Sequence, residues 1–336
     1  MRIVAKAPCR VDLAGGTLDI WPLYLYHPGS VTVNFAVDLY AGCSVSTRRD
    51  KRIVLRSLDL DAQETFPSLE ALRASRTYIL PLHAHLLRFF SPRTGLNIET
   101  TSRAPAGAGL AGSSTMIIAL ASALERLNGV HHGKERLRAI AQDIEAQIIR
   151  VPTGCQDYYP ALYGGVSAIE LAPGAIRRIG ISVDPDELNE RVVLVYTGEP
   201  RRSGINNWEV TKAHIGGDKR VHRNFDRIAE IACAMRGALE RADWAEAGRL
   251  LLEEWDHRRR NAPGITTPLI DALVAKARRR GATGAKVCGA GGGGCVVFLV
   301  EHGAKSRVAA AAESLGAKVI PVRLAPHGVR VVAVPK

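Results

Sequence analysis

A glycine-rich segment that runs directly into a helix pattern constrains this chain more than any other feature. Residues 105–115 read PAGAGLAGSST, and the apolar positions after them recur at helical spacing until Asn128-Gly129, a normal helix exit. The three glycines let backbone amides turn toward an anion, and the three hydroxyl residues that follow lie where a helix presents unpaired amides and its positive dipole end. The segment therefore predicts a phosphate site; a turn that only closes onto the helix is the alternative.

This segment is not one of the two most familiar nucleotide loops. No Gly-Lys-Ser or Gly-Lys-Thr follows the glycines, which excludes a Walker A loop. No first strand of a βαβ unit precedes them, which argues against the dinucleotide-binding fingerprint.

The composition fits a globular protein with one large or two medium domains. The chain has 336 residues, of which 46% are hydrophobic and 23% are charged. No apolar run approaches the ~20 residues of a membrane span, and the amino end lacks the pattern of a signal peptide, so we expect a cytoplasmic protein without membrane contact. The six cysteines form no Cys-x-x-Cys pair, so we expect reduced thiols rather than a zinc site or disulfides.

The net charge of +12 raises the question of a nucleic-acid partner. Arginines gather in the short runs Arg201-Arg202, Arg258 to Arg260 and Arg278 to Arg280, without the interleaved aromatic residues of a single-strand platform. Solvated helix faces, or a field that attracts anionic substrates, explain these runs more simply. We therefore expect no nucleic-acid partner.

The expected elements run from strands to helices and back to strands, which favours an α+β fold over a regularly alternating parallel sheet. Strands are expected at residues 2–7, 31–37, 42–47, 53–58, 96–101, 165–171 and 191–196, with two more around a glycine cluster near the carboxyl end. Helices are expected at residues 78–90, 114–128, 134–149, 221–240, 244–259 and 268–280. The weakest point, Val183 to Asp186, predicts one domain over residues 1–184 and a second over residues 187–336.

A second segment with chemical content is Ile144 to Tyr158. Glu145 lies beside the apolar face of its helix, where a carboxylate is unusual unless it has a partner or a function. Thr153 and Gln156 have the spacing of a capping box, which predicts a new helix with Asp157 in its first turn. Taken singly, each carboxylate also has a structural explanation, as an edge residue or as a partner of the helix dipole.

Two further segments complete the set. Near the amino end, Arg10 and Asp19 flank a tight Gly-Gly turn after a strand, where arginine would clamp a phosphate or steady a carboxylate and the aspartate would bind sugar hydroxyls. The alternative there is a surface hairpin with an incidental ion pair. Residues 289–294 read GAGGGG between two strands. Ordering so many glycines costs more conformational entropy than an ordinary linker would, so we expect this backbone to approach a ligand or a neighbouring loop closely.

Together these stretches resemble the GHMP kinase family, named for galactokinase, homoserine kinase, mevalonate kinase and phosphomevalonate kinase. The family's first motif is similar to Ala7–Asp19, its nucleotide loop to Pro105–Thr115, and its third motif to Gly289–Gly293. Within the family, RVDLAGG resembles fucokinases, and the same region with GCQDY at residues 154–158 resembles D-glycero-D-manno-heptose 7-phosphate kinases.

The resemblance implies a role for individual residues. Asp157 would be the catalytic carboxylate, Arg10 would steady it and the transferring phosphoryl group, Ser114 and Glu145 would hold magnesium, and Asp19 would bind the sugar. The nucleotide would lie on Pro105, Gly107, Ala108, Gly109, Leu110, Gly112, Ser113, Ser114 and Thr115. The acceptor would also contact Gly16, Thr17, Gly154, Gln156, Gly291 and Gly292.

The activity implied is that of an ATP-dependent sugar kinase that uses Mg²⁺ and phosphorylates an anomeric hydroxyl, that of a free sugar or of a heptose 7-phosphate. The fold implied is a GHMP-kinase-like pair of α+β units with a central active-site cleft. Partners would be ATP and a small sugar or sugar phosphate, with a monomer and a homodimer both open.

Departures from the family pattern keep the acceptor open. Gly15 to Asp19 lacks the glutamate of the Gly-Glu-His-Thr-Asp motif of galactokinases, which argues against galactose. Arg201 or Arg202 would hold a second phosphate on the acceptor if that segment faces the pocket. A fucokinase, another free-sugar kinase, a kinase for a mevalonate-like alcohol and a catalytically silent sugar sensor remain the alternatives.

Overall fold

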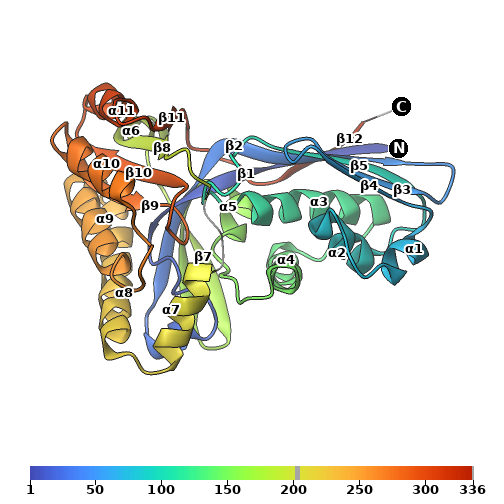
Figure 1. The fold of residues 1–336 in the computed structure, drawn as a ribbon, viewed down its shortest axis with the longest axis horizontal. Helices are drawn as coiled ribbons and strands as arrows, with labels where there is room; N and C mark the ends of the chain where they lie inside the picture. Colours follow the sequence, from blue (N-terminus) through green and yellow to red (C-terminus); the bar gives the residue numbers. More distant parts are fainter. Residues whose placement is uncertain (201–204, 335–336) are drawn as a thin grey trace.

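The computed structural model describes residues 1–200 and 205–334, and within these ranges the strands form two sheets (Figure 1). The larger sheet runs β12-β1-β2-β5-β3-β4, with β6 and β7 attached to β2. Its strands are β1 (Arg2–Ala14), β2 (Val31–Thr47), β3 (Ile53–Ser57), β4 (Ala62–Phe66), β5 (Leu96–Ser102), β6 (Val166–Ala172), β7 (Ala175–Ile181) and β12 (Arg330–Val334).

The long strand β2 gives the larger sheet its branched shape. Its carboxyl half pairs with β5 and its amino half pairs with β6, all antiparallel. The only parallel pair recorded in the described sheets joins β3 to β5. The pairing of β1 with β2 shifts register between Pro8 and Cys9, where β2 carries extra residues opposite the bend.

One face of the larger sheet is covered by the helices of the amino-terminal half, which Figure 1 shows below it. They are α1 (Leu69–Ala74), α2 (Pro81–Phe90), α3 (Gly112–Asn128), α4 (Lys134–Ile149) and α5 (Tyr158–Tyr163). Helix α3 is central: residues 114–125 are all buried, and it packs on β1 and β2. This packing fixes the start of α3, and with it the glycine-rich segment that precedes it.

The smaller sheet runs β11-β8-β10-β9. Its strands are β8 (Val192–Tyr196), β9 (Ala282–Val287), β10 (Cys295–Val300) and β11 (Lys318–Ile320). The carboxyl-terminal half also contributes α6 (Pro185–Arg191), α7 (Ile205–Ile215), α8 (Lys219–Glu240), α9 (Trp244–Arg258), α10 (Pro268–Arg278) and α11 (Lys305–Glu313). Helices α8 and α9 also contact β1 of the larger sheet, so a buried apolar core joins the two halves.

The α+β prediction is confirmed, and α4 has the predicted bounds. Two details differ. Residues 31–37 and 42–47 belong to one strand, because the bulge opposite Pro8 and Cys9 absorbs the irregular residues between them. Helix α3 begins at Gly112 rather than at Ser114. The predicted division at residues 184–187 stays a prediction; the last strand, β12, returns to pair with β1.

None of the helices in the described ranges has the length and apolarity needed to cross a membrane. Of the six cysteines, Cys233 is exposed and the other five are buried.

Candidate active site

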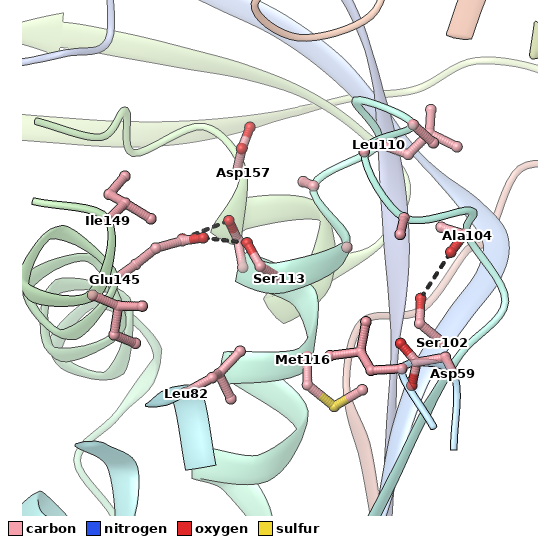
Figure 2. Close-up of a pocket in the computed structure, with 18 of the residues that line it drawn as sticks. Asp59, Leu82, Ser102, Ala104, Leu110, Ser113, Met116, Glu145, Ile149 and Asp157 are labelled. Carbon is pink, nitrogen blue, oxygen red and sulfur yellow. Dashed lines mark hydrogen bonds between the residues drawn. The ribbon is translucent and has the colours of Figure 1, made fainter. Parts of the chain in front are cut away.

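The glycine-rich segment borders a cleft of about 430 Å³ that is lined mainly by residues 57–157 of the amino-terminal half. Residues 104–114 line it, together with Glu145 and Asp157 (Figure 2). Asn207 of α7 and Ala290 of the glycine cluster also line it, so both halves of the chain contribute. The cleft brings together segments that are about 185 residues apart in sequence.

Neighbouring backbone holds the glycine-rich segment in place. The amide of Arg10 donates to the carbonyl of Leu110 at 3.1 Å, and the amide of Cys295 donates to the carbonyl of Ala108 at 2.8 Å. A Cβ on Gly294 would lie only 2.7 Å from that same carbonyl of Ala108, so a side chain there would push the two loops apart. The expected close approach of the glycine cluster to a neighbouring loop is therefore confirmed.

Glu145 faces the amino end of α3 from α4, as Figure 2 shows. Its carboxylate accepts hydrogen bonds from the hydroxyls of Ser113, Ser114 and Tyr158, the last two at 2.6 Å. Burial raises the pKa of Glu145, and the three hydroxyls act against that rise. A buried carboxylate among hydroxyls is a set of hard oxygen donors, the kind that Mg²⁺ prefers.

Asp157 lines the same cleft as Glu145 and lies directly before α5. The Nε and Nη2 atoms of Arg10 both donate to its Oδ1, at 2.9 and 2.7 Å. The Arg10 side chain is 3% exposed and that of Asp157 is 23% exposed, so the carboxylate is open to the cleft while its partner is not. Burial opposes the charge on Arg10, but Asp157 and Asp12 raise its pKa above the usual range.

The predicted position of Asp157 in the first turn of a helix is wrong. Helix α5 begins at Tyr158, and Asp157 is its N-cap residue, with no cap hydrogen bond from its side chain. The side chain is held by Arg10 instead of by the helix amides, because a buried, charged guanidinium binds a carboxylate more strongly than neutral backbone amides do.

Two family models match the chain. Residues 77–165 match the model of the GHMP kinases N terminal domain, and residues 235–318 match that of the GHMP kinases C terminal, so the matches cover just over half of the chain. The chain belongs to the GHMP kinase family. It is a phosphotransferase with an alcohol group as acceptor, and ATP is the phosphoryl donor that this family uses.

Individual relatives are similar along nearly their whole length. A D-glycero-alpha-D-manno-heptose 7-phosphate kinase from Campylobacter jejuni is 26% identical over 310 residues, which cover 89% of each chain. A mevalonate kinase from Thermococcus sibiricus is 23% identical, with 98% of each chain covered. The crystal structure of a D-glycero-D-manno-heptose 1-phosphate kinase from Bacteroides thetaiotaomicron has a TM-score of 0.78 at 24% identity, covering 99% of this chain and 100% of that one, which shows the shared fold.

In this GHMP kinase, Asp19 is turned toward the segment that carries Asp157. Its Oδ2 accepts the backbone amide of Gln156 at 2.8 Å, and its Oδ1 accepts the side-chain amide of Gln156 at 3.3 Å. A Cβ on Gly154 would overlap the same carboxylate. Burial, and to a smaller extent the negative charge of Asp157, raises the pKa of Asp19 to about 6. The hydrogen bond from the backbone amide of Gln156 acts in the opposite direction. The structure thus brings Asp19, Gly154 and Gln156 together.

Other predicted contact residues of the kinase have partners inside the protein. Thr115 is fully buried, and its hydroxyl lies 3.5 Å from the carbonyl of Pro8. The amide of Gly292 donates to the carbonyl of Ile265 at 2.8 Å, beside Gly291. None of these three predicted contacts lines the cleft of the described residues.

Sequence reasoning missed a buried charge network behind Arg10. The Nζ of Lys286 on β9 lies 2.7 Å from Asp12 and 2.8 Å from Glu254 of α9, and all three residues are completely buried. Burial opposes ionisation of Asp12, but Lys286 and Arg10 hold its pKa well below the usual range. Two features of the sequence indicate these buried charges: Glu254 lies on the apolar face of α9, and Lys286 lies within an apolar strand.

Arg258 belongs to the same network and corrects the expectation of a solvated arginine run. It is 5% exposed, and it donates to the carbonyl of Gly16 at 2.9 Å and to the hydroxyl of Thr17 at 3.1 Å. A further bond of 2.6 Å reaches the carbonyl of Gly289. Arg258 therefore ties the first motif to the third, and Gly16 and Thr17 are fixed from behind. Arg201 and Arg202 lie outside the described residues.

Proposed function

We propose that this protein is an ATP-dependent sugar kinase that phosphorylates the anomeric hydroxyl of D-glycero-D-manno-heptose 7-phosphate. One observation carries the phosphoryl-transfer part: a partly exposed carboxylate, Asp157, held by the buried Arg10 on the wall of a cleft that the glycine-rich loop also lines. The choice of acceptor is supported by the similarity to the Campylobacter jejuni heptose 7-phosphate kinase over 89% of both chains.

In the proposed reaction, the acceptor hydroxyl attacks the γ-phosphorus of ATP. A bond forms between that oxygen and phosphorus, the bond to the departing ADP breaks, and the hydroxyl proton passes to the carboxylate of Asp157. Arg10 orients the carboxylate through its two hydrogen bonds to Oδ1. Because Arg10 is itself fixed by Asp12 at 3.5 Å, this arrangement is set before substrate arrives.

The nucleotide would extend along the glycine-rich loop. Backbone amides near the start of α3 would hold the phosphates, since a helix amino end favours anions. The cleft lining also includes the apolar side chains of Leu60, Ile79, Leu82 and Met116. Leu60 is 58% exposed and Ile79 is 65% exposed, so both offer apolar surface to a ligand in the cleft. We place the adenine base there.

Magnesium would lie at Ser114 and Glu145, where a carboxylate and hydroxyls converge. A bound divalent cation neutralises the charge of the nucleotide phosphates and thereby assists transfer. The chain's own part is to hold the carboxylate: the hydroxyl of Tyr158 donates to its Oε2 from behind, at 2.6 Å.

The proposal is tested by incubating the protein with magnesium and ATP against a panel of acceptors and measuring ADP release. The panel contains heptose 7-phosphate, the free heptose, L-fucose, galactose and mevalonate. We expect the highest kcat/KM with heptose 7-phosphate and product phosphorylated at the anomeric carbon. Faster turnover of fucose or mevalonate would show that the proposed acceptor is wrong and that the protein is a kinase for another alcohol. If no member of the panel is turned over, the sugar-kinase proposal is wrong.

A further inference from the structure

Three histidines gather at a place that the phosphoryl-transfer chemistry does not use. His27 follows the 3-10 helix η1 (Leu23–Tyr26), His214 lies on α7 and His222 lies on α8. One ring nitrogen from each lies within 4.8 Å of the others. The three residues come from separate elements, so the fold and not a local sequence motif assembles the cluster.

The histidine cluster has the outer hydrogen bonds that orient metal ligands. The Nδ1 of His27 is 2.7 Å from the carboxylate of Asp226, which leaves its Nε2 directed at the cluster, 2.7 Å from the Nε2 of His214. The Nε2 of His222 donates to the backbone carbonyl of His214 at 2.8 Å. A carboxylate or carbonyl on the far nitrogen is the usual second partner of a histidine that binds a metal.

His214 is completely buried, and its Nε2 faces the Nε2 of His27 at 2.7 Å. Its Nδ1 is the nitrogen on the other side of the ring, and it has no hydrogen-bond partner among the described residues. The ring is therefore held by packing and by the bond to His27, and it has no outer partner of the kind that His27 and His222 have.

We propose that His27, His214 and His222 form a binding site for a transition-metal ion of the zinc class, separate from the magnesium of the cleft. Imidazole nitrogens select Zn²⁺, Co²⁺ or Ni²⁺, whereas Mg²⁺ prefers oxygen ligands. Three histidines leave a fourth position for water, and His222, which is only partly buried, gives the ion a way in. Tetrahedral coordination sets ligand nitrogens about 3.3 Å apart, so the rings of His27 and His214 need to separate by about 0.6 Å.

The bound metal would join the segment after η1 to α7 and α8, two helices that follow each other in the chain. It would tie the segment after η1 to the carboxyl end of α7 and the first turns of α8. Helix α7 also carries Asn207, which lines the cleft. The metal therefore serves a structural role, holding α7 against the body of the molecule without taking part in phosphoryl transfer.

The test is direct metal binding by untagged, full-length protein that has been treated with a chelator and dialysed. Equilibrium dialysis with Zn²⁺, followed by elemental analysis, is expected to give one equivalent per chain. Co²⁺ is expected to give the strong visible absorption of a tetrahedral site. The variant His222→Gln changes a partly buried ligand, and Asp226→Asn changes only the outer partner of His27; each is expected to weaken Zn²⁺ binding at least 10-fold.

His131→Gln is the matched control, because His131 is an exposed histidine far from the cluster in sequence, and it is expected to bind as the parent does. Less than half an equivalent of Zn²⁺ in the parent protein would overturn the site. So would full binding by a correctly folded His222→Gln variant. Thermal unfolding with and without Zn²⁺ gives a second readout: the parent is stabilised and His222→Gln is not.

Discussion

Arg10 and Asp157 are joined by two hydrogen bonds that end on the same carboxylate oxygen, Oδ1, from Nε at 2.9 Å and from Nη2 at 2.7 Å. The remaining guanidinium nitrogen, Nη1, donates to the carbonyl of Gly109 in the glycine-rich loop. One buried side chain therefore positions both the proposed proton acceptor and the loop that would hold the nucleotide. Among the described residues, no other donor reaches the Asp157 carboxylate, so its Oδ2 is left for the acceptor.

The variant Arg10→Lys is expected to lower kcat by about 10²-fold, because a lysine makes one point contact and cannot bond both Asp157 and Gly109 in the fixed fork of a guanidinium. Steady-state kinetics and a far-UV spectrum check this, with Arg2→Lys, an exposed residue of the same strand, as the control. If kcat stays within threefold of the parent, Arg10 does not position Asp157.

Removing the central cation of the buried network is expected to destabilise the protein. Lys286→Met leaves the carboxylates of Asp12 and Glu254 buried without their partner, and breaking such a pair costs about 3–5 kcal/mol. Urea unfolding measures the change in free energy. Arg249→Met is the control, because its pairs with Glu246 and Glu253 lie on the surface and should contribute less than about 1 kcal/mol. Equal effects of the two variants would contradict a special role for the network.

Local patterns predicted the segments whose structure is decided locally. Helix α4 has the predicted bounds, because its apolar positions repeat at helical spacing and a glycine precedes it. The glycine cluster was predicted to approach another backbone, and Gly294 does so at Ala108. Helix α3 was predicted two residues short, because Gly112 reads as a loop residue until tertiary packing extends the helix over it.

Features that depend on contacts distant in sequence could not be read from the chain. The capping-box spacing at Thr153 and Gln156 gave the wrong position for Asp157, since the side chain is captured by Arg10, 147 residues away. Glu254 on the apolar face of α9 and Lys286 within an apolar strand indicate buried charges, but no local pattern names their partners. Arg258 was expected on a solvated helix face. Only the fold shows that their charges meet behind the first motif.

The variant Glu145→Gln is expected to raise the Mg²⁺ concentration needed for half-maximal activity by about 10-fold, because it removes the one carboxylate charge of the proposed metal site. Activity measured across a Mg²⁺ titration at fixed ATP gives this value. Tyr158→Phe removes a hydrogen bond to the same carboxylate without changing its charge, and it should shift the requirement much less. A Mg²⁺ requirement unchanged in Glu145→Gln would place the ion elsewhere.

Asp19 predicts a specific dependence of stability on pH. Its pKa is raised from 3.8 to about 6 in the folded protein, so the folded state binds this proton more tightly than the unfolded state does. The stabilising contribution is complete below pH 4 and is lost as the pH rises through 6. From pH 4 to pH 7, the free energy of unfolding of the parent should fall relative to that of Asp19→Asn by up to about 3 kcal/mol.

Urea unfolding of both proteins at several pH values isolates the effect of Asp19, because every other titrating group is shared. A difference between parent and Asp19→Asn that stays constant from pH 4.5 to pH 7 would show that the carboxylate titrates normally.

The most direct test of the proposed chemistry is the single-turnover rate of phosphoryl transfer in Asp157→Asn, measured beside the affinity of the same variant for ATP. Asparagine keeps the size of the side chain and cannot accept the proton. We therefore predict that the rate of phosphoryl transfer falls by about 10²-fold to 10⁴-fold. ATP affinity should stay within about threefold, because no hydrogen bond within the described residues joins this carboxylate to the nucleotide loop and Arg10 keeps its own bond to the carbonyl of Gly109. Transfer at near the parent rate in Asp157→Asn would contradict the account.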